Sequence, residues 1–167
     1  LVLKNKIHYL TDKELKSLEN LAHSEKIYSS LKKIDKDYND FSKFIYAYEI
    51  YVNKNLFKVH NSPNSIEDKI FESIISRLEF LNNYKKLSLK IYLESQKNSR
   101  YFLILSKSLN NYFSNYSNNL FNKSIMLSLY AVSFNIWIED NKELDKTMSF
   151  LGNSLDYLKK IKPFLVK

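Results

Sequence analysis

Hydrophobic residues recur every three or four positions along most of this chain, which is the spacing of amphipathic α-helices and not of strands. Thr11 and Glu14 have the form of a capping box in front of leucines at positions 15, 18 and 21, so a short helix is expected there. A second short helix is expected over 25–34, "EKIYSSLKKI". A long amphipathic helix is predicted from residue 40 onward, with an inward stripe made of Phe41, Phe44, Ile45, Tyr48, Val52 and Leu56.

The clearest break in the pattern is "NSPNS" at 61–65, which holds one of the two prolines. Ser65 and Asp68 are expected to cap the following helix, whose inward stripe is Ile66, Ile70, Ile74, Leu78 and Leu81. Two further helices are predicted near 84–95 and 99–113. An Asn/Ser-rich loop then precedes an apolar helix over 119–139, which we expect to be buried.

The single Trp and the single Gly both lie between 134 and 161, around an acidic turn. Asp140 and Glu143 are expected to cap the last helix, and Trp137 is expected in the core. Gly152 falls inside that helix, where it either permits another helix to approach closely or is simply tolerated. The inward seam of the last helix is predicted to be Leu144, Met148, Leu151, Leu155 and Leu158.

These patterns predict an all-α protein of eight or nine helices in a single domain over 1–167. A helix-turn-helix-like part is expected over 1–37 and a larger helical part over 38–167. A single glycine excludes glycine-rich phosphate loops and argues against a β-rich fold, whose turns need glycine. The lack of cysteine excludes disulfides, thiolate metal sites and cysteine nucleophiles.

The net charge of +8 suggests an acidic partner, which could be a nucleic acid, an anionic membrane surface or an acidic protein. The lysines are spread along the chain, a pattern typical of solvated helix faces. The apolar uncharged run 124–138 is fifteen residues long, shorter than the ~20 needed to span a bilayer. Because the chain begins at Leu1 and not at Met, a trimmed start is expected.

Motifs for catalysis and metal binding are missing from the sequence. His8, His23 and His60 lie in different segments, and none forms the E-x-x-H pair of a di-iron bundle. There is no H-E-x-x-H zinc helix and no G-x-S-x-G nucleophile elbow. The acidic group at 139–143 is explained by helix capping. We therefore predict that the protein is not an enzyme and binds no metal.

The first two short helices could form a helix-turn-helix, but the turn "AHSEK" lacks the glycine that such turns often use. The second helix offers Lys26, Lys32 and Lys33 for phosphates, and no Arg, Asn or Gln to read base edges. Non-specific contact with nucleic acid fits this composition, whereas sequence-specific recognition is not favoured.

The C-terminal half resembles one family, the TetR-like lipid-binding accessory proteins of ubiquinone (coenzyme Q) biosynthesis, found in mitochondria and alphaproteobacteria. The segment "RLEFLNNYKK" at 77–86 and the degenerate first helices are also similar to that family. Three blocks between 119 and 151 carry the resemblance: Asn119, Phe121 and Lys123; Leu129, Tyr130, Trp137 and Asp140; Thr147, Phe150 and Leu151.

The resemblance implies a TetR-like fold, a homodimer, no cofactor, and an isoprenoid quinone precursor or phospholipid as the bound ligand. It further implies that the lipid is presented to a demethoxyubiquinone hydroxylase, in the mitochondrial matrix or alphaproteobacterial cytoplasm at the inner membrane. An apolar pocket suits such a tail, which offers nothing to hydrogen-bond. The expected lipid-binding residues are Leu103, Leu105, Met126, Leu129, Tyr130, Phe134 and Trp137.

Two further surfaces follow from the resemblance. Asn110 and Phe113 stand where the family's partner-binding patch has Asp and Trp, in a region that is shortened here and lacks the family's Gly-Asp pair. Lys159, Lys160, Ile161 and Phe164 suit contact with an anionic membrane. The alternatives are a TetR-like transcriptional regulator that binds DNA and a helical protein-interaction module.

Overall fold

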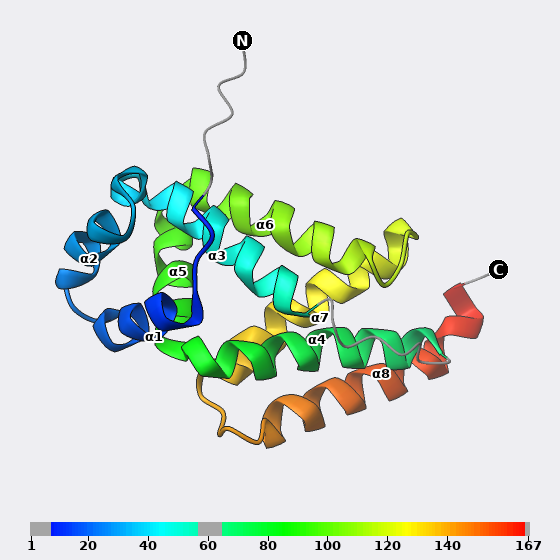
Figure 1. The fold of residues 1–167 in the computed structure, drawn as a ribbon. Helices are drawn as coiled ribbons and strands as arrows, with labels where there is room; N and C mark the ends of the chain where they lie inside the picture. The colour runs from blue at the N-terminus through cyan, green and yellow to red at the C-terminus, as the bar shows by residue number, and fades with distance from the viewer. Residues whose placement is uncertain (1–7, 57–64, 166–167) are drawn as a thin grey trace, which may run out of the picture. The chain divides into compact units, whose positions relative to one another are not determined.

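The computed structural model of this chain describes residues 8–56 and 65–165, and the side chains of all of these except 161–165. No strand occurs among the described residues, so the all-α class is confirmed (Figure 1). Positions 61–64 of the predicted "NSPNS" break lie outside the described residues. The helices are α1 (Asp12–Leu21), α2 (Lys26–Ile34), α3 (Phe41–Leu56), α4 (Ile66–Leu81), α5 (Lys85–Lys97), α6 (Ser99–Ser114), α7 (Leu120–Ile138) and α8 (Asp145–Leu165), with short 3-10 helices η1 (Lys36–Asn39) and η2 (Asn82–Tyr84).

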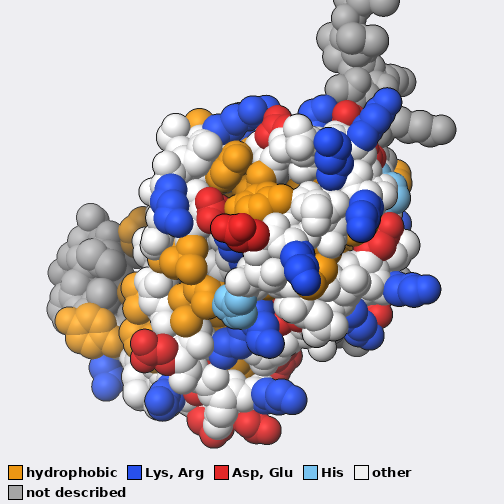
Figure 2. Space-filling view, turned by 90° about the vertical axis from the view of Figure 1, so that its left-hand side faces the viewer, with side chains coloured by type: hydrophobic (Ala, Val, Ile, Leu, Met, Phe, Trp, Pro, Cys, Tyr) orange, Lys and Arg blue, Asp and Glu red, His pale blue; other side chains and the backbone are white. Residues whose placement is uncertain are grey.

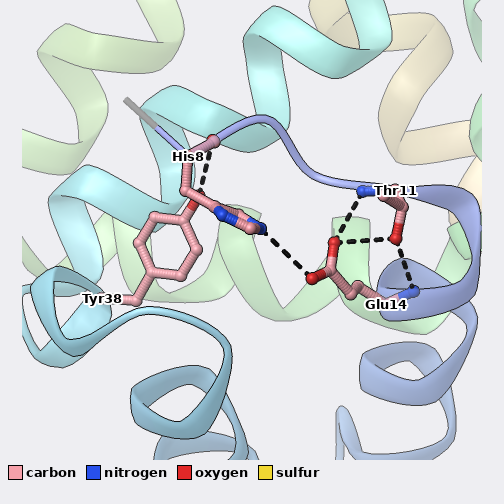
Figure 3. A network of polar contacts seen from close by, with 4 residues as sticks. All are labelled: His8, Thr11, Glu14 and Tyr38. Carbon is pink, nitrogen blue, oxygen red and sulfur yellow. Dashed lines mark hydrogen bonds and ion pairs between the residues drawn. The ribbon is translucent and has the colours of Figure 1, made fainter. Parts of the chain in front are cut away.

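The predicted capping box begins α1. The Thr11 hydroxyl accepts a hydrogen bond from the Glu14 backbone N–H at 3.3 Å, and the Glu14 carboxylate accepts one from the Thr11 backbone N–H at 2.8 Å (Figure 3). The same carboxylate lies 3.2 Å from His8 Nε2, and the Tyr38 hydroxyl donates to the His8 carbonyl at 3.0 Å. His8 contacts both Glu14 and Tyr38, and so it connects the start of α1 to η1. Ser65 likewise caps α4 by accepting from the Asp68 N–H at 3.1 Å.

The chain folds as two compact units, each built from segments that alternate along the sequence. Unit 1 comprises residues 1–57 and 83–108, and unit 2 comprises 58–82 and 109–167, each as far as the residues are described. Unit 1 includes 83–108 because α5 begins against α1: the Glu19 carboxylate accepts the backbone N–H groups of Lys86 and Leu87 at 2.9 and 2.8 Å. The sequence-based division at residue 37 follows chain order, whereas these units do not.

The core of unit 1 is built around α3, on which the predicted stripe is buried from Phe41 to Leu56. Tyr48 reaches α5 through a 2.8 Å hydrogen bond between its hydroxyl and that of Ser88. The buried Glu49 accepts a hydrogen bond from Ser108 Oγ on α6 at 2.6 Å. Helices α5 and α6 are thus attached to α3 by polar bonds as well as by apolar packing.

Unit 2 contains α4, α7, α8 and the end of α6, and α4, α7 and α8 pack against one another. Figure 1 shows α4 and α8 side by side. Leu151 and Leu155 of α8 are buried, as is Leu144 just before the helix, while Met148 and Leu158 are half-buried. The predicted seam therefore does face the interior. This packing buries one face of α7. Helix α8 covers a second face of α7 only in part.

Candidate binding groove between α7 and α8

Helix α7 is apolar on nearly all sides and carries one charged residue, Lys123, in its 19 residues. Asn119 begins it, because its side-chain oxygen accepts the backbone N–H groups of Phe121 and Asn122 at 2.8 and 3.2 Å. The inner stripe is buried. A second stripe is not: Leu120, Phe121 and Val132 expose 75, 59 and 47% of their surface. The helix expected to be buried is therefore open along one face.

This outer face and α8 enclose a groove of about 630 Å³ that is open to solvent along one side. Its walls are mainly apolar, with four small neutral polar side chains among them. Among the described side chains that line it, none is charged. The α7 wall consists of Phe121, Ser124, Ile125, Ser128 and Leu129, and the α8 wall of Phe150, Asn153, Ser154, Tyr157 and Leu158. A groove of this volume and polarity suits an apolar ligand or an apolar segment of a protein.

The interior of unit 2 on the other side of α7 is filled by aromatic side chains around a buried arginine. Arg77 Nε donates to the Tyr130 hydroxyl at 3.2 Å, and the guanidinium carbon lies 5.2 Å from the centre of the Tyr112 ring. The Tyr112 hydroxyl donates to the Ser73 carbonyl at 2.8 Å, and burial raises the pKa of that phenol above its ordinary value. Phe113 packs edge-on against Tyr130. Hydrogen bonds and ring contacts hold these groups together, so this side of α7 is packed core.

The structure places one of the seven expected lipid-binding residues, Leu129, in the groove. Leu103 lies on α6 in unit 1, where 55% of its surface is exposed, and Leu105 is half-buried in the same unit. The other four are core residues of α7: Met126, Tyr130, Phe134 and Trp137. The residues that sequence reasoning missed repeat at helical spacing over 121–129 and 150–158. The signal that could have found them is the apolar character of both stripes of α7.

The expected partner-binding pair is split between surface and core. Asn110 is exposed, whereas Phe113 is fully buried, with its ring centre 5.1 Å from that of Tyr112. Phe113 is therefore not accessible to a partner at the surface, because it contributes to the core of unit 2. A Phe near the end of an amphipathic helix faces the core as readily as solvent, and the motif alignment alone does not decide which.

The expected membrane-contact residues lie at the end of α8. Lys159 and Lys160 are exposed, and Lys159 Nζ is 3.8 Å from an Asp156 carboxylate oxygen. The side chains of Ile161 and Phe164 lie outside the described residues. In the part of the chain that the structure describes, no helix is both long and apolar enough to cross a membrane.

The acidic turn between α7 and α8 is organised by Asp140. Its carboxylate accepts the Thr147 backbone N–H and hydroxyl, both at 2.7 Å, and the backbone N–H groups of Asn141 and Lys146 at 2.9 and 3.3 Å. Burial alone would raise the pKa of Asp140, but these bonds outweigh it and hold the pKa below its ordinary value. Asp140 therefore caps the start of α8, as predicted, by accepting the backbone N–H groups of Lys146 and Thr147. Glu143, the other predicted member of the cap, is not among these partners. No group of His, Asp and Glu side chains suited to a metal ion occurs among the described residues.

Gly152 sits on α8 with open space where a side chain would begin: a Cβ built there meets no atom within 4 Å. The helix is therefore not approached closely at this position. We expect Gly152→Ala to raise the free energy of unfolding by about 1 kcal/mol, because alanine loses less backbone entropy on forming a helix. Urea titration followed by far-ultraviolet circular dichroism measures this. An alanine variant less stable than the wild type would show that the position is crowded.

The helix-turn-helix-like part of unit 1 presents a mixed surface. Lys26, Lys32 and Lys33 of α2 are exposed, as the sequence suggested. The face drawn in Figure 2 shows basic side chains dispersed among carboxylates and separate apolar patches, and not a continuous basic stripe. This arrangement suits a solvated helical surface better than a groove-reading DNA interface.

Comparison of the chain with models of known protein families, with curated proteins and with solved structures finds no match. The resemblance to the ubiquinone accessory family therefore rests on the three residue blocks between 119 and 151.

Proposed function

We propose that this protein is a non-enzymatic lipid-binding protein that holds the apolar tail of its ligand in the groove between α7 and α8. The observation that carries the proposal is an open groove of about 630 Å³ with apolar walls, in which none of the described lining side chains is charged. Pockets of ~300–1,000 Å³ are typical of small-molecule sites. An isoprenoid or acyl tail is the class of ligand that such walls suit, because it requires no hydrogen bonds.

The ligand that the family resemblance favours is an isoprenoid quinone precursor, presented to a membrane-associated hydroxylase. Three of the resemblance residues, Phe121, Leu129 and Phe150, line the groove. The open side would let a bound tail enter and leave without unfolding of the helices. Ser124, Ser128, Asn153 and Ser154 supply the few polar atoms that could orient a head group.

A helical protein-interaction module is the second candidate, favoured by the exposure of α7 beyond the groove. Leu120 and Val132 expose 75 and 47% of their surface. Exposed apolar residues in a contiguous patch mark protein interfaces as well as ligand sites. The expected homodimer would cover such a face with a second copy of the chain.

The first experiment is extraction of the purified protein with organic solvent and mass spectrometry of the extract, beside a native mass spectrum of the intact protein. A quinone or phospholipid at one per protomer is the expected result. A dimer that carries no lipid and takes up none from added ubiquinone would contradict the lipid proposal and favour the interaction module.

The site itself is tested by filling it. Ser128 is exposed and lines the groove, so Ser128→Trp should occupy the space without disturbing the core. We expect at least a tenfold weaker uptake of ubiquinone, measured by titration of the delipidated protein. Ala131→Trp is the matched control, since Ala131 is an exposed α7 residue three positions on and does not line the groove. If both variants lost ubiquinone uptake equally, or if neither lost it, the groove would not be the binding site.

A further inference from the structure

A second surface, in unit 1, has the composition of a membrane contact. Helix α6 packs on α3 through one face: the Tyr101 ring lies 5.7 Å from that of Phe41, and Ser108 bonds to both Glu49 and Asn53, at 2.6 and 3.0 Å. Figure 1 shows the two helices side by side over this stretch. Successive helical residues are turned by ~100°, so the residue two positions after Tyr101 points away from α3.

That outward face carries two adjacent large apolar side chains. Phe102 exposes 59% of its surface and Leu103 exposes 55%. None of residues 99–108 is buried, although this stretch holds five large apolar residues. Apolar surface of this kind, concentrated on one turn of a helix, is normally covered by a partner.

The excess positive charge in the described part of unit 1 lies on α5 and α6. Residues 83–108 contain six basic residues and one acidic residue, whereas 8–56 contain eight of each. Arg100 lies one turn before Leu103, Lys107 lies one turn after it, and Lys97 ends α5 at the corner into α6. Among the described residues of unit 1, the excess positive charge therefore comes from α5 and α6.

The cations of this face remain available to a partner. Arg100 is 3.2 Å from Asp40 and Lys97 is 3.8 Å from Glu94, yet their side chains stay 66 and 72% exposed. Exposed ion pairs of this kind contribute little and are readily exchanged. Lys107 is also exposed.

An apolar pair flanked by lysine and arginine is complementary to a lipid surface with anionic head groups. The apolar side chains enter the boundary between head groups and acyl chains, while the cations stay at the level of the phosphates. Single-stranded nucleic acid fits less well, because it needs aromatic faces for stacking. Phe102 offers one such face, whereas Leu103 offers none and the Tyr101 ring packs against Phe41.

We propose that the outward face of α6, formed by Arg100, Phe102, Leu103 and Lys107 with Lys97 at its edge, docks the protein on an anionic membrane surface. This surface lies in unit 1 and does not depend on the α7/α8 groove for its chemistry. It also differs from the C-terminal residues of α8 that the sequence suggested for membrane contact.

Co-sedimentation with vesicles tests the proposal, using phosphatidylcholine alone and phosphatidylcholine mixed with phosphatidylserine in equal parts. We expect binding to the mixed vesicles, and at least a tenfold weaker binding when Phe102→Ser and Leu103→Ser are combined. Both side chains are more than half exposed, so the circular dichroism spectrum should not change. Tyr46→Ser is the matched control, because Tyr46 is an aromatic residue of the same unit, on α3, with 49% of its surface exposed.

A second pair of variants separates a local site from the overall charge. Arg100→Gln with Lys107→Gln should weaken binding to the mixed vesicles, while Lys32→Gln with Lys33→Gln on α2 should leave it unchanged. Equal losses in the two pairs would overturn the proposal, since net charge alone would explain them. So would binding that survives the loss of Phe102 and Leu103, a protein that ignores both kinds of vesicle, or a face that binds single-stranded RNA and no vesicle.

Discussion

Replacing Trp137 with alanine should lower the free energy of unfolding by about 4 kcal/mol, the largest effect expected of a single substitution considered for this chain. Trp137 is fully buried at the end of α7, with its ring centre 5.0 Å from that of Phe134. Its indole N–H donates to Asn82 Oδ1 at 2.8 Å. Alanine removes both the packed volume and the donor, and leaves a cavity that helices α4, α7 and α8 can close only in part.

The loss also reaches the turn between α7 and α8. The same Asn82 donates through Nδ2 to the Lys142 carbonyl at 3.1 Å, so Trp137 and the turn share one side chain. Trp137→Phe keeps most of the volume and removes the donor, and should cost about 1–2 kcal/mol. The difference in unfolding free energy between the two variants therefore measures the contribution of the packed ring volume. The loss in the phenylalanine variant measures mainly the contribution of the hydrogen bond.

Urea titration followed by far-ultraviolet circular dichroism measures both variants, since the only tryptophan is the residue exchanged. Val132→Ala on the same helix is the control, because 47% of that side chain is exposed, and it should change the stability by about 0.5 kcal/mol or less. Stabilities of ~5–15 kcal/mol are typical of single domains, so the alanine variant could leave little margin. An alanine variant within 1 kcal/mol of the wild type would show that the site collapses around the missing ring.

The sequence predicts helix starts well because caps are local. Thr11 and Ser65, both predicted as caps, each accept the backbone N–H three residues ahead, an arrangement readable within four letters of sequence. The inward stripe of α3 is equally readable, since its polar and apolar faces differ. In these elements local preference and tertiary packing agree.

The orientation of α7 could not be predicted in the same way. Its apolar residues occur on nearly all sides, so periodicity does not distinguish the stripe of Tyr130 and Trp137 from that of Phe121 and Ile125. Which stripe faces inward depends on α4, some fifty residues earlier in the chain. The groove combines one wall from 121–129 with another from 150–158, and only tertiary packing brings these together.

Leu103 shows the same limit on α6. Its neighbours in the sequence suggest a core position, but Tyr101 and Ser108 contact α3 and turn Leu103 outward. A helix with apolar residues at positions 101–105 can bury several alternative faces, and the distant polar bonds of Glu49 and Asn53 select one of them. The fold class therefore follows from local pattern, whereas the candidate sites follow from contacts between distant segments.

Asp140→Asn should lower the free energy of unfolding at neutral pH by about 2 kcal/mol. The carboxylate accepts four hydrogen bonds at the start of α8 and is 8% exposed. Asparagine has nearly the same shape, but one of its two polar atoms is an amide nitrogen, which would face N–H and O–H donors. Leu144 in the same turn has a φ of 61°, a left-handed conformation that costs a non-glycine residue free energy.

The difference between wild type and Asp140→Asn should depend on pH in a defined direction. Because folding holds the pKa of Asp140 below its ordinary value, the ionised side chain stabilises the fold fully above the unfolded pKa of about 3.9. This contribution is lost as the pH falls below that value through the lower pKa of the folded state. The two stabilities should therefore converge below pH ~4, in urea titrations at a series of pH values.

Asp156→Asn on α8 is the control for this titration, because its side chain is 70% exposed and its partner Lys159 is 3.8 Å away. Its stability should stay within about 0.5 kcal/mol of the wild type at every pH. A constant gap between Asp140→Asn and wild type down to pH ~3 would mean that shape, and not charge, sets the role of this residue. A gap that closes only for Asp140→Asn would identify the ionised carboxylate as the group that holds the turn and the start of α8, and with them the α8 wall of the groove.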